Sequence, residues 1–239
     1  MRYRWSCLAV VFAAALTAGA APGPTTTKPA ATRPAAETPA YMAGLDPNGL
    51  GTPEELVRRR WGALLRVLQD EKLDRKAKES RVEKIVNPIF DFAVIARLAL
   101  GKANWRKLTV PQRETFTELF VKRLKESYGK RIAAYEGEKV VFKPPLPRKA
   151  PQGAKPATRP AKPPTIVHVP VEIASKTRRS VILHKFRRVG NRWRIYDVEI
   201  EGVSILLTYR SQFNDILRRG TVEELLARLR KPPPAPPDR

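Results

Sequence analysis

Residues 193–213, WRIYDVEIEGVSILLTYRSQF, hold the densest apolar patterning of the chain. The first part of this stretch alternates between apolar and polar residues, which predicts a β-strand. Glu201 and Gly202 break the alternation, and the apolar residues that follow have the longer spacing of a helix. The stretch offers neither a credible nucleophile nor a metal-ligating set. We therefore expect it to form a wall and the rim of an apolar cavity rather than a catalytic site.

Two more strands are predicted just before this stretch. Residues 165–174 alternate and place Val167, Val169 and Val171 on one face, and residues 180–189 form the next strand. Short turns separate these strands from each other and from residue 193 onward, which predicts an antiparallel meander.

Helical spacing dominates the first half of the chain, with helices expected to begin near residues 53, 74, 91 and 110. Thr52 and Thr109 each precede an acidic or amide residue by three positions, the pattern of a capping box. The last of these helices carries an apolar stripe at steps of three or four residues. Such a stripe is usually core, and part of it can also line a ligand cavity. Its members are Phe116, Phe120, Leu124, Tyr128, Ile132 and Tyr135.

Residues 1–20 have the features of a cleavable secretory signal: Arg2 and Arg4, then the apolar run LAVVFAAAL, then Ala-Gly-Ala. The apolar run is shorter than the roughly 20 residues that a membrane span requires. The only cysteine, Cys7, lies inside this signal, so the exported chain would have no disulfide and no thiolate metal site. We expect an exported protein that is stabilised by its core alone.

Pro-rich segments flank and interrupt the remaining chain. We expect residues 21–51 to be a disordered Pro/Thr/Ala-rich tether, 52–230 a single folded domain, and 231–239 a disordered tail. Residues 143–164 form a basic Pro-rich insert, which we expect to be an exposed loop outside the sheet.

The formal net charge of +23 predicts an acidic partner such as anionic lipid headgroups or wall polymers. Export argues against nucleic acid. A solvated basic surface without a partner is the simpler alternative that composition leaves open.

Two groups of side chains are candidates for a metal or catalytic site. His168 and His184 fall on adjacent predicted strands, but two histidines without a carboxylate make a poor metal or acid–base site. Asp197, Glu199 and Glu201 share one strand face, where paired carboxylates could hydrolyse a glycoside. A solvent-facing surface neutralised by nearby arginines explains them more simply. We therefore predict no enzyme activity, no metal and no cofactor.

Three segments carry a resemblance to a known family. They are FDFAVIARLALGKANWRKLTVPQRETFTELF at 90–120, YEGEKV at 135–140 and WRIYDVEIEGVSILLTYRSQFNDIL at 193–217. In these segments the chain resembles the MlaC family of toluene-tolerance proteins. The resemblance implies an α+β fold related to the NTF2-like class, with a curved, mostly antiparallel sheet wrapped by helices around an apolar cavity.

The same resemblance implies a periplasmic carrier that takes the acyl chains of a glycerophospholipid into its cavity and leaves the headgroup outside. It further implies alternate docking to an inner-membrane Mla-type ABC transporter and an outer-membrane lipoprotein–porin complex, with transient contact at the membrane surface.

Apolar strand faces and the facing helix stripe supply the candidate cavity residues. These are Phe116, Phe120, Leu124, Tyr128, Val167, Val169, Val171, Tyr196, Val198, Ile200, Val203 and Leu206. Arg131 and Arg210 are the candidates for a headgroup-binding rim. Two alternatives from other functional classes remain: an exported basic module that binds cell-wall or surface polyanions, and a hydrolase built on Asp197 and Glu199.

Overall fold

The structure is a computed structural model that describes residues 45–46, 50–132, 137–147, 165–175 and 179–232. The predicted signal and most of the predicted tether, insert and tail lie outside these residues. Within the described part of the chain, no helix combines the length and apolar character needed to cross a membrane.

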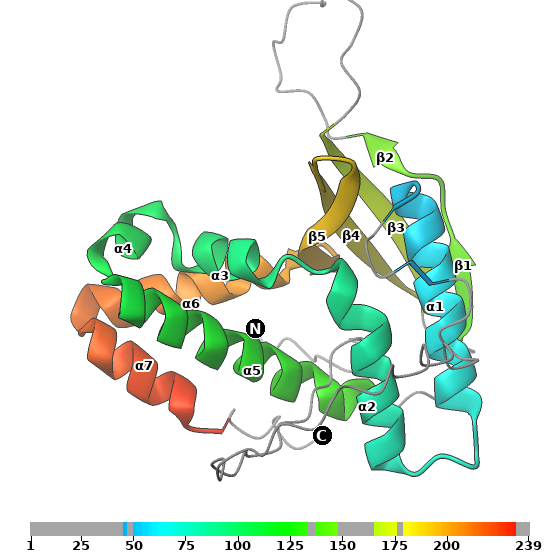
Figure 1. The fold of residues 1–239 in the computed structure, drawn as a ribbon, viewed down its shortest axis with the longest axis horizontal. Coiled ribbons are helices and arrows are strands. Elements are labelled where there is room, and N and C mark those ends of the chain that lie inside the picture. The colour runs from blue at the N-terminus through cyan, green and yellow to red at the C-terminus, as the bar shows by residue number, and fades with distance from the viewer. Residues whose placement is uncertain (1–44, 47–49, 133–136, 148–164, 176–178, 233–239) are drawn as a thin grey trace, which may run out of the picture.

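One layer of the fold is an antiparallel sheet with the strand order β1-β3-β4-β5-β6, in which β2 also pairs with β3 (Figure 1). The strands are β1 Lys139–Phe142, β2 Leu146–Pro147, β3 Ile166–Ala174, β4 Arg179–Val189, β5 Arg192–Ile200 and β6 Val203–Ser204. Strands β3, β4 and β5 confirm the predicted meander. The short β6 was not predicted, because two residues are too few to show a periodicity.

Helices form the rest of the fold. They are α1 Pro53–Gln69, α2 Arg75–Val86, η2 Asn87–Ile89, α3 Phe92–Leu100, α4 Lys102–Lys107, α5 Val110–Ile132, α6 Ile205–Arg219 and α7 Val222–Arg230. Helix α1 lies along the sheet, whereas α3 to α7 pack on one another beside it (Figure 1). The α+β class predicted from the sequence is confirmed.

Local capping explains where the helices begin. Thr52 and Glu55 form the predicted capping box, in which the Thr52 hydroxyl accepts from the Glu55 amide at 3.2 Å. Thr109 and Gln112 form the second predicted box. Asp91 begins α3 as predicted, accepting from the Val94 amide at 3.1 Å. The segment around Trp105, for which the sequence analysis named no separate element, forms the short helix α4.

Two segments that were predicted to lie outside the folded core contribute to it in part. The insert predicted over 143–164 contains the short strand β2, in which Leu146 pairs with His168 and Pro147 pairs with Val167. Proline is tolerated there because an edge strand leaves one side of its backbone unpaired. Likewise, the tether predicted over 21–51 is fixed near its end.

Arg60 is the residue that fixes the end of the tether. Its guanidinium is buried and donates to the Asp46 carbonyl at 2.6 Å and to the Ile85 carbonyl. Burial lowers the pKa of Arg60 to about 10, and the nearby Asp46 carboxylate acts in the opposite direction. Leu45 packs against the core beside this contact. Arg60 therefore ties the segment before α1 to the end of α2.

Candidate functional site

The sheet presents one continuous apolar face. Val167, Val169 and Val171 of β3 lie on it and are buried, as the alternation predicted. Their cross-strand partners on β4 are Phe186, His184 and Ile182. Helix α1 covers this part of the face, where the Trp61 ring meets the His184 ring edge-on at a centroid distance of 6.3 Å.

The helices cover the apolar face of the sheet incompletely at β5 and β6. Val198 pairs with His184 and Ile200 pairs with Ile182, so both lie on the same apolar face as the β3 valines. They are only partly buried, whereas Val169 and Val171 are 0% exposed. Val203 faces Ile200 from β6 and is 39% exposed. The apolar face therefore continues beyond its cover, and an apolar ligand could complete it.

Tyr196 does not share this face in the way that the alternation predicted. A β-bulge lies there, because Phe186 pairs with Ile195 while the adjacent Lys185 pairs with Asp197, so the strand register skips Tyr196. Ile195 takes the buried position at 1% exposure. Simple alternation fails here because one extra residue reverses the facing of every residue before it.

The stripe on α5 packs against α6. Phe116 and Phe120 are 0% exposed, and their rings lie 5.4 Å and 5.2 Å from the ring of Phe213. The Tyr209 ring lies 4.9 Å from that of Phe120. This aromatic cluster is core, the more common of the two roles considered for the stripe. Two other candidates, Leu124 and Leu206, are also buried. The side chains of Tyr128 and Arg131 lie outside the described residues.

Arg210 binds the backbone of α3. Its Nε and Nη2 donate to the Leu98 carbonyl at 2.8 Å and 2.6 Å. This carbonyl lies in the last turn of α3, where helical carbonyls lack an intrahelical partner. This contact anchors the Arg210 guanidinium to α3, and the headgroup-rim role of Arg210 stays a prediction.

Asp197 is buried at 6% exposure, so its predicted place on a solvent-facing surface is wrong. One carboxylate oxygen accepts from the Ser204 hydroxyl at 2.7 Å and from Lys185 at 3.0 Å, and the other accepts from the Leu206 amide at 3.1 Å. Ser204 also caps α6 by accepting from the Leu207 amide at 3.1 Å. Asp197 thus fixes the start of α6 to the strand before it.

Lys185, rather than an arginine, neutralises the acids of β5. Its ammonium lies 3.0 Å from Asp197 and 2.7 Å from Glu199. Burial alone would lower the pKa of Lys185, but the hydrogen bonds to Glu199 and Asp197 outweigh it and raise that pKa. The hydrolase alternative requires two carboxylates that are free to act on a substrate, whereas Lys185 holds both acids in ion pairs.

The two histidines lie on opposite faces of the sheet. His184 pairs with Val169 on the covered face, whereas His168 pairs with Lys185 on the other. A joint site for them is therefore excluded by the register. Burial lowers the pKa of His184 to about 4, although a contact with the Val169 carbonyl acts in the opposite direction. Among the described residues, no group of three or more His, Cys, Asp or Glu side chains could hold a metal ion.

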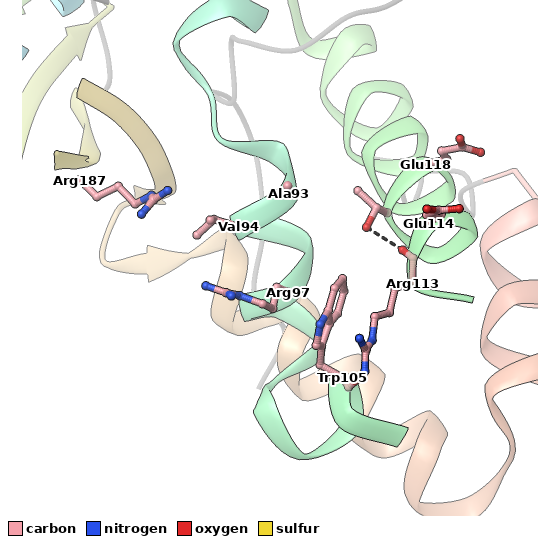
Figure 2. A pocket seen from close by; sticks show the side chains of 9 residues that line it. Ala93, Val94, Arg97, Trp105, Arg113, Glu114, Glu118 and Arg187 are labelled. Atoms are coloured by element: carbon pink, nitrogen blue, oxygen red, sulfur yellow. Dashed lines mark hydrogen bonds between the residues drawn. The ribbon is translucent and has the colours of Figure 1, made fainter. Parts of the chain in front are cut away.

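A surface cleft that the sequence did not reveal lies between α3 and α5 and has a volume of about 690 Å³ (Figure 2). Trp105 of α4 lies between Arg97 and Arg113 in this cleft. No sequence pattern predicted this cleft, because its lining residues come from four separate elements.

Comparison with known proteins assigns the chain to a family. A family model described as "MlaC protein" matches residues 61–231, which is most of the chain. The chain belongs to the MlaC family. Proteins of the MlaC family are lipid-binding carriers and not enzymes, which agrees with the interpretation from sequence.

Two similar proteins illustrate the relationship. Toluene tolerance protein ttg2D of Pseudomonas putida is 22% identical over 174 residues, which cover 71% of this chain and 74% of the relative. A phospholipid-binding protein from Ralstonia solanacearum, solved in complex with a phospholipid, matches with a TM-score of 0.61 and 21% identity. That match covers 75% of this chain and 95% of the other, and it shows a shared fold.

Proposed function

We propose that this protein is a periplasmic carrier that moves glycerophospholipids between the inner and outer membranes in an Mla-type system. Membership of the MlaC family over residues 61–231 is the observation that carries this proposal. The likeness of fold to a protein solved with a phospholipid supports it. The apolar face left partly uncovered at β5 and β6 supplies a physical reason for it.

The energetics of the cargo explain why such a carrier is needed. Burying an acyl methylene is worth about 0.8 kcal/mol, so two chains of roughly sixteen carbons each would cost on the order of 25 kcal/mol to expose to water. A carrier has only to replace water with apolar side chains. Aliphatic walls without directed polar groups do this and still permit release.

We propose that the acyl chains lie along the sheet face at its uncovered end, against Val198, Ile200 and Val203. We propose that the chains also approach the other predicted cavity residues. These are Phe116, Phe120, Leu124, Tyr128, Val167, Val169, Val171, Tyr196 and Leu206. Because several of them are fully buried, the chains would enter by separating the helical layer from the sheet rather than by filling an existing void.

For partners we propose an inner-membrane Mla-type ABC transporter complex and an outer-membrane lipoprotein–porin complex, with transient contact at the membrane surface. Family membership supports both complexes. The net charge of +23 supports contact with anionic headgroups. It also favours the second candidate, an exported module for cell-wall polyanions.

A transfer assay separates the two candidates. Donor vesicles carry a self-quenched fluorescent phospholipid, and acceptor vesicles carry none. A carrier should accelerate dequenching in proportion to its concentration. With vesicles of zwitterionic lipid alone, this acceleration should persist at 0.5 M salt at about the same rate, because burial of acyl chains is not screened. If transfer stays at the spontaneous rate and the protein instead binds wall polymer in a salt-sensitive manner, the polyanion function replaces the carrier function.

A further inference from the structure

The hairpin that joins β4 to β5 is strongly basic. Residues 187–194, which we call the β4–β5 tip, read RRVGNRWR and contain no Asp or Glu. Val189 pairs with Arg192, so Gly190 and Asn191 alone form the turn, and Gly190 takes a φ of 60°. A two-residue turn of this kind holds both strand ends in a fixed register. Residues 188–192 are all exposed, so the tip presents an ordered basic surface to its surroundings.

The arginines of the β4–β5 tip differ in how they are paired. Arg187 binds Asp91 at 2.6 Å. Within the described part of the chain, neither Arg188 nor Arg192 forms an ion pair. Burial lowers the pKa of Arg194, and the positive charge of Arg192 lowers it further, although Asp91 acts in the opposite direction. An anionic partner at the tip would reduce the repulsion between Arg192 and Arg194.

A second basic segment leaves the sheet beside this tip. Residues 148–164 lie outside the described residues, and their sequence holds five Lys or Arg and no acid. Strand β2 leads into this segment and ends at Pro147, which pairs with Val167 (Figure 1). The chain returns at Thr165, whose carbonyl accepts from the Arg188 amide at 2.9 Å. Both ends of the basic segment are therefore fixed at the same end of the sheet as the β4–β5 tip.

The apolar residues of the β4–β5 tip favour an anionic phospholipid bilayer over a soluble polyanion. Val189 is 41% exposed and lies opposite Arg192, while Trp193 pairs with Arg188 and is partly buried. Clustered basic residues bind anionic leaflets, and tryptophan is enriched at the level of the headgroups. Arginine binds phosphate through its planar set of donors. A bilayer therefore matches both the charge and the exposed valine of the tip.

The β4–β5 tip lies far from the proposed acyl-chain contacts. Arg192 begins β5 and Ile200 ends it. At about 3.3 Å per residue, these two positions lie roughly 26 Å apart along the strand. A bilayer that contacts the tip would therefore not contact the uncovered apolar face at β5 and β6.

We propose that the β4–β5 tip docks the protein on an anionic phospholipid bilayer, with the uncovered sheet end at β5 and β6 directed away from the membrane. Arg188 and Arg192 bind lipid phosphates, and Val189 enters the interface. This orientation leaves the uncovered end open to a protein partner. The proposal deepens the carrier function proposed above and rests on its contact with a membrane.

Sedimentation with vesicles measures the docking. The exported protein should bind vesicles that contain about one third phosphatidylglycerol, should bind pure phosphatidylcholine weakly, and should be released at 0.5 M salt. Arg188→Gln/Arg192→Gln should weaken binding about thirtyfold, since each basic residue at an anionic surface contributes about a factor of five. The control Arg219→Gln/Arg228→Gln removes two exposed arginines from α6 and α7 and should weaken it at most about threefold. Equal weakening in the two variants would overturn the docking surface.

A soluble polyanion distinguishes a bilayer from a wall polymer. Val189→Asn should weaken vesicle binding about threefold, because the valine side chain leaves water only at a bilayer. The same variant should bind dextran sulfate as the wild type does. Val110→Asn, at another exposed valine, is the control and should bind vesicles like the wild type. If Val189→Asn has the same effect on both ligands, or no effect on either, the partner is a polyanion and the bilayer is excluded.

Spin labels test the orientation on the membrane. The only cysteine, Cys7, lies in the predicted signal, so single labels can be placed on the exported chain. A label on Asn191→Cys should become shielded from a water-soluble relaxation agent when anionic vesicles are added. A label on Leu207→Cys, at a residue that is 55% exposed near the start of α6, should stay accessible. Shielding at position 207, or none at position 191, would overturn the proposed orientation.

Lipid content separates this proposal from the carrier function. Arg188→Gln/Arg192→Gln should keep the wild-type amount of phospholipid per protein, because the tip lies away from the acyl-chain contacts. If the wild type holds no phospholipid, the carrier function fails, and the vesicle measurements decide the role of the tip on their own. A variant that loses its phospholipid while its circular dichroism spectrum is unchanged would contradict the separation of docking from cargo.

Discussion

The carboxylate of Asp197 accepts a hydrogen bond from the Ser204 hydroxyl at 2.7 Å. This contact joins strand β5 to the N-cap residue of helix α6. Between them, Glu201 and Gly202 take positive φ angles of 50° and 82° to reverse the chain. The turn, the cap of α6 and the buried acid therefore act as one structural unit.

Removing the Asp197 carboxylate should destabilise the protein strongly. Asp197→Ala leaves the Leu206 amide and the Ser204 hydroxyl without their acceptor, which should lower the free energy of unfolding by about 3 kcal/mol or more. Glu199→Gln removes the other acid beside Lys185, but from a partly exposed position, and should cost at most about 1 kcal/mol. Urea unfolding monitored by circular dichroism measures both values. Similar losses for the two variants would show that Asp197 has no special structural role.

Arg210 should contribute to stability rather than to cargo binding. Arg210→Met removes both donors from the Leu98 carbonyl and should cost about 1–3 kcal/mol. Lipid content per folded protein should stay at the wild-type level. The reverse pattern, a stable variant that has lost its lipid, would restore the headgroup role first suggested by the sequence.

Acid should weaken the fold through His184. Its pKa is about 4 in the folded state because of burial, compared with an ordinary value of 6.5, so the unfolded state binds a proton first as the pH falls. The contribution is complete above pH 6.5, is lost progressively down to about pH 4, and amounts to about 3 kcal/mol at most. Urea midpoints between pH 7 and pH 4 should fall less steeply in His184→Leu than in the wild type. His168→Gln is the control and should keep the wild-type slope.

The partly uncovered sheet face should be needed for lipid. Ile200→Asn places an amide on that face and should reduce the lipid content about tenfold, since it removes apolar contact worth roughly 1–2 kcal/mol. Val181→Asn changes an exposed valine, at 45% exposure, on the opposite face of the neighbouring strand. This control should retain its lipid. Equal lipid content in both variants would place the acyl chains elsewhere.

The spacing of apolar residues and the helix-capping residues were sufficient to predict much of the fold. The helix starts at Thr52, Asp91 and Thr109 and the β3–β5 meander follow from local chemistry and are present in the structure. What local patterns could not show was the bulge at Tyr196, because an inserted residue leaves the composition of a strand unchanged while it reverses its facing.

The environment of charged residues was harder to predict from sequence. Asp197 was expected in solvent because acids on a strand usually face water, yet α6 begins over it and buries it. Lys185 was likewise given no partner, since the acid that it binds lies 12 residues away in the chain. The cleft at Trp105 needed four elements to meet, and only the tertiary structure shows this.

The most direct test of a carrier function is the lipid content of the protein itself. The exported protein should be purified from its cells without detergent, extracted with organic solvent, and analysed by mass spectrometry against a measured protein amount. A phospholipid carrier should yield close to one glycerophospholipid per protein. An empty extract, together with a failure of the purified protein to take up phospholipid from vesicles, would contradict the carrier function.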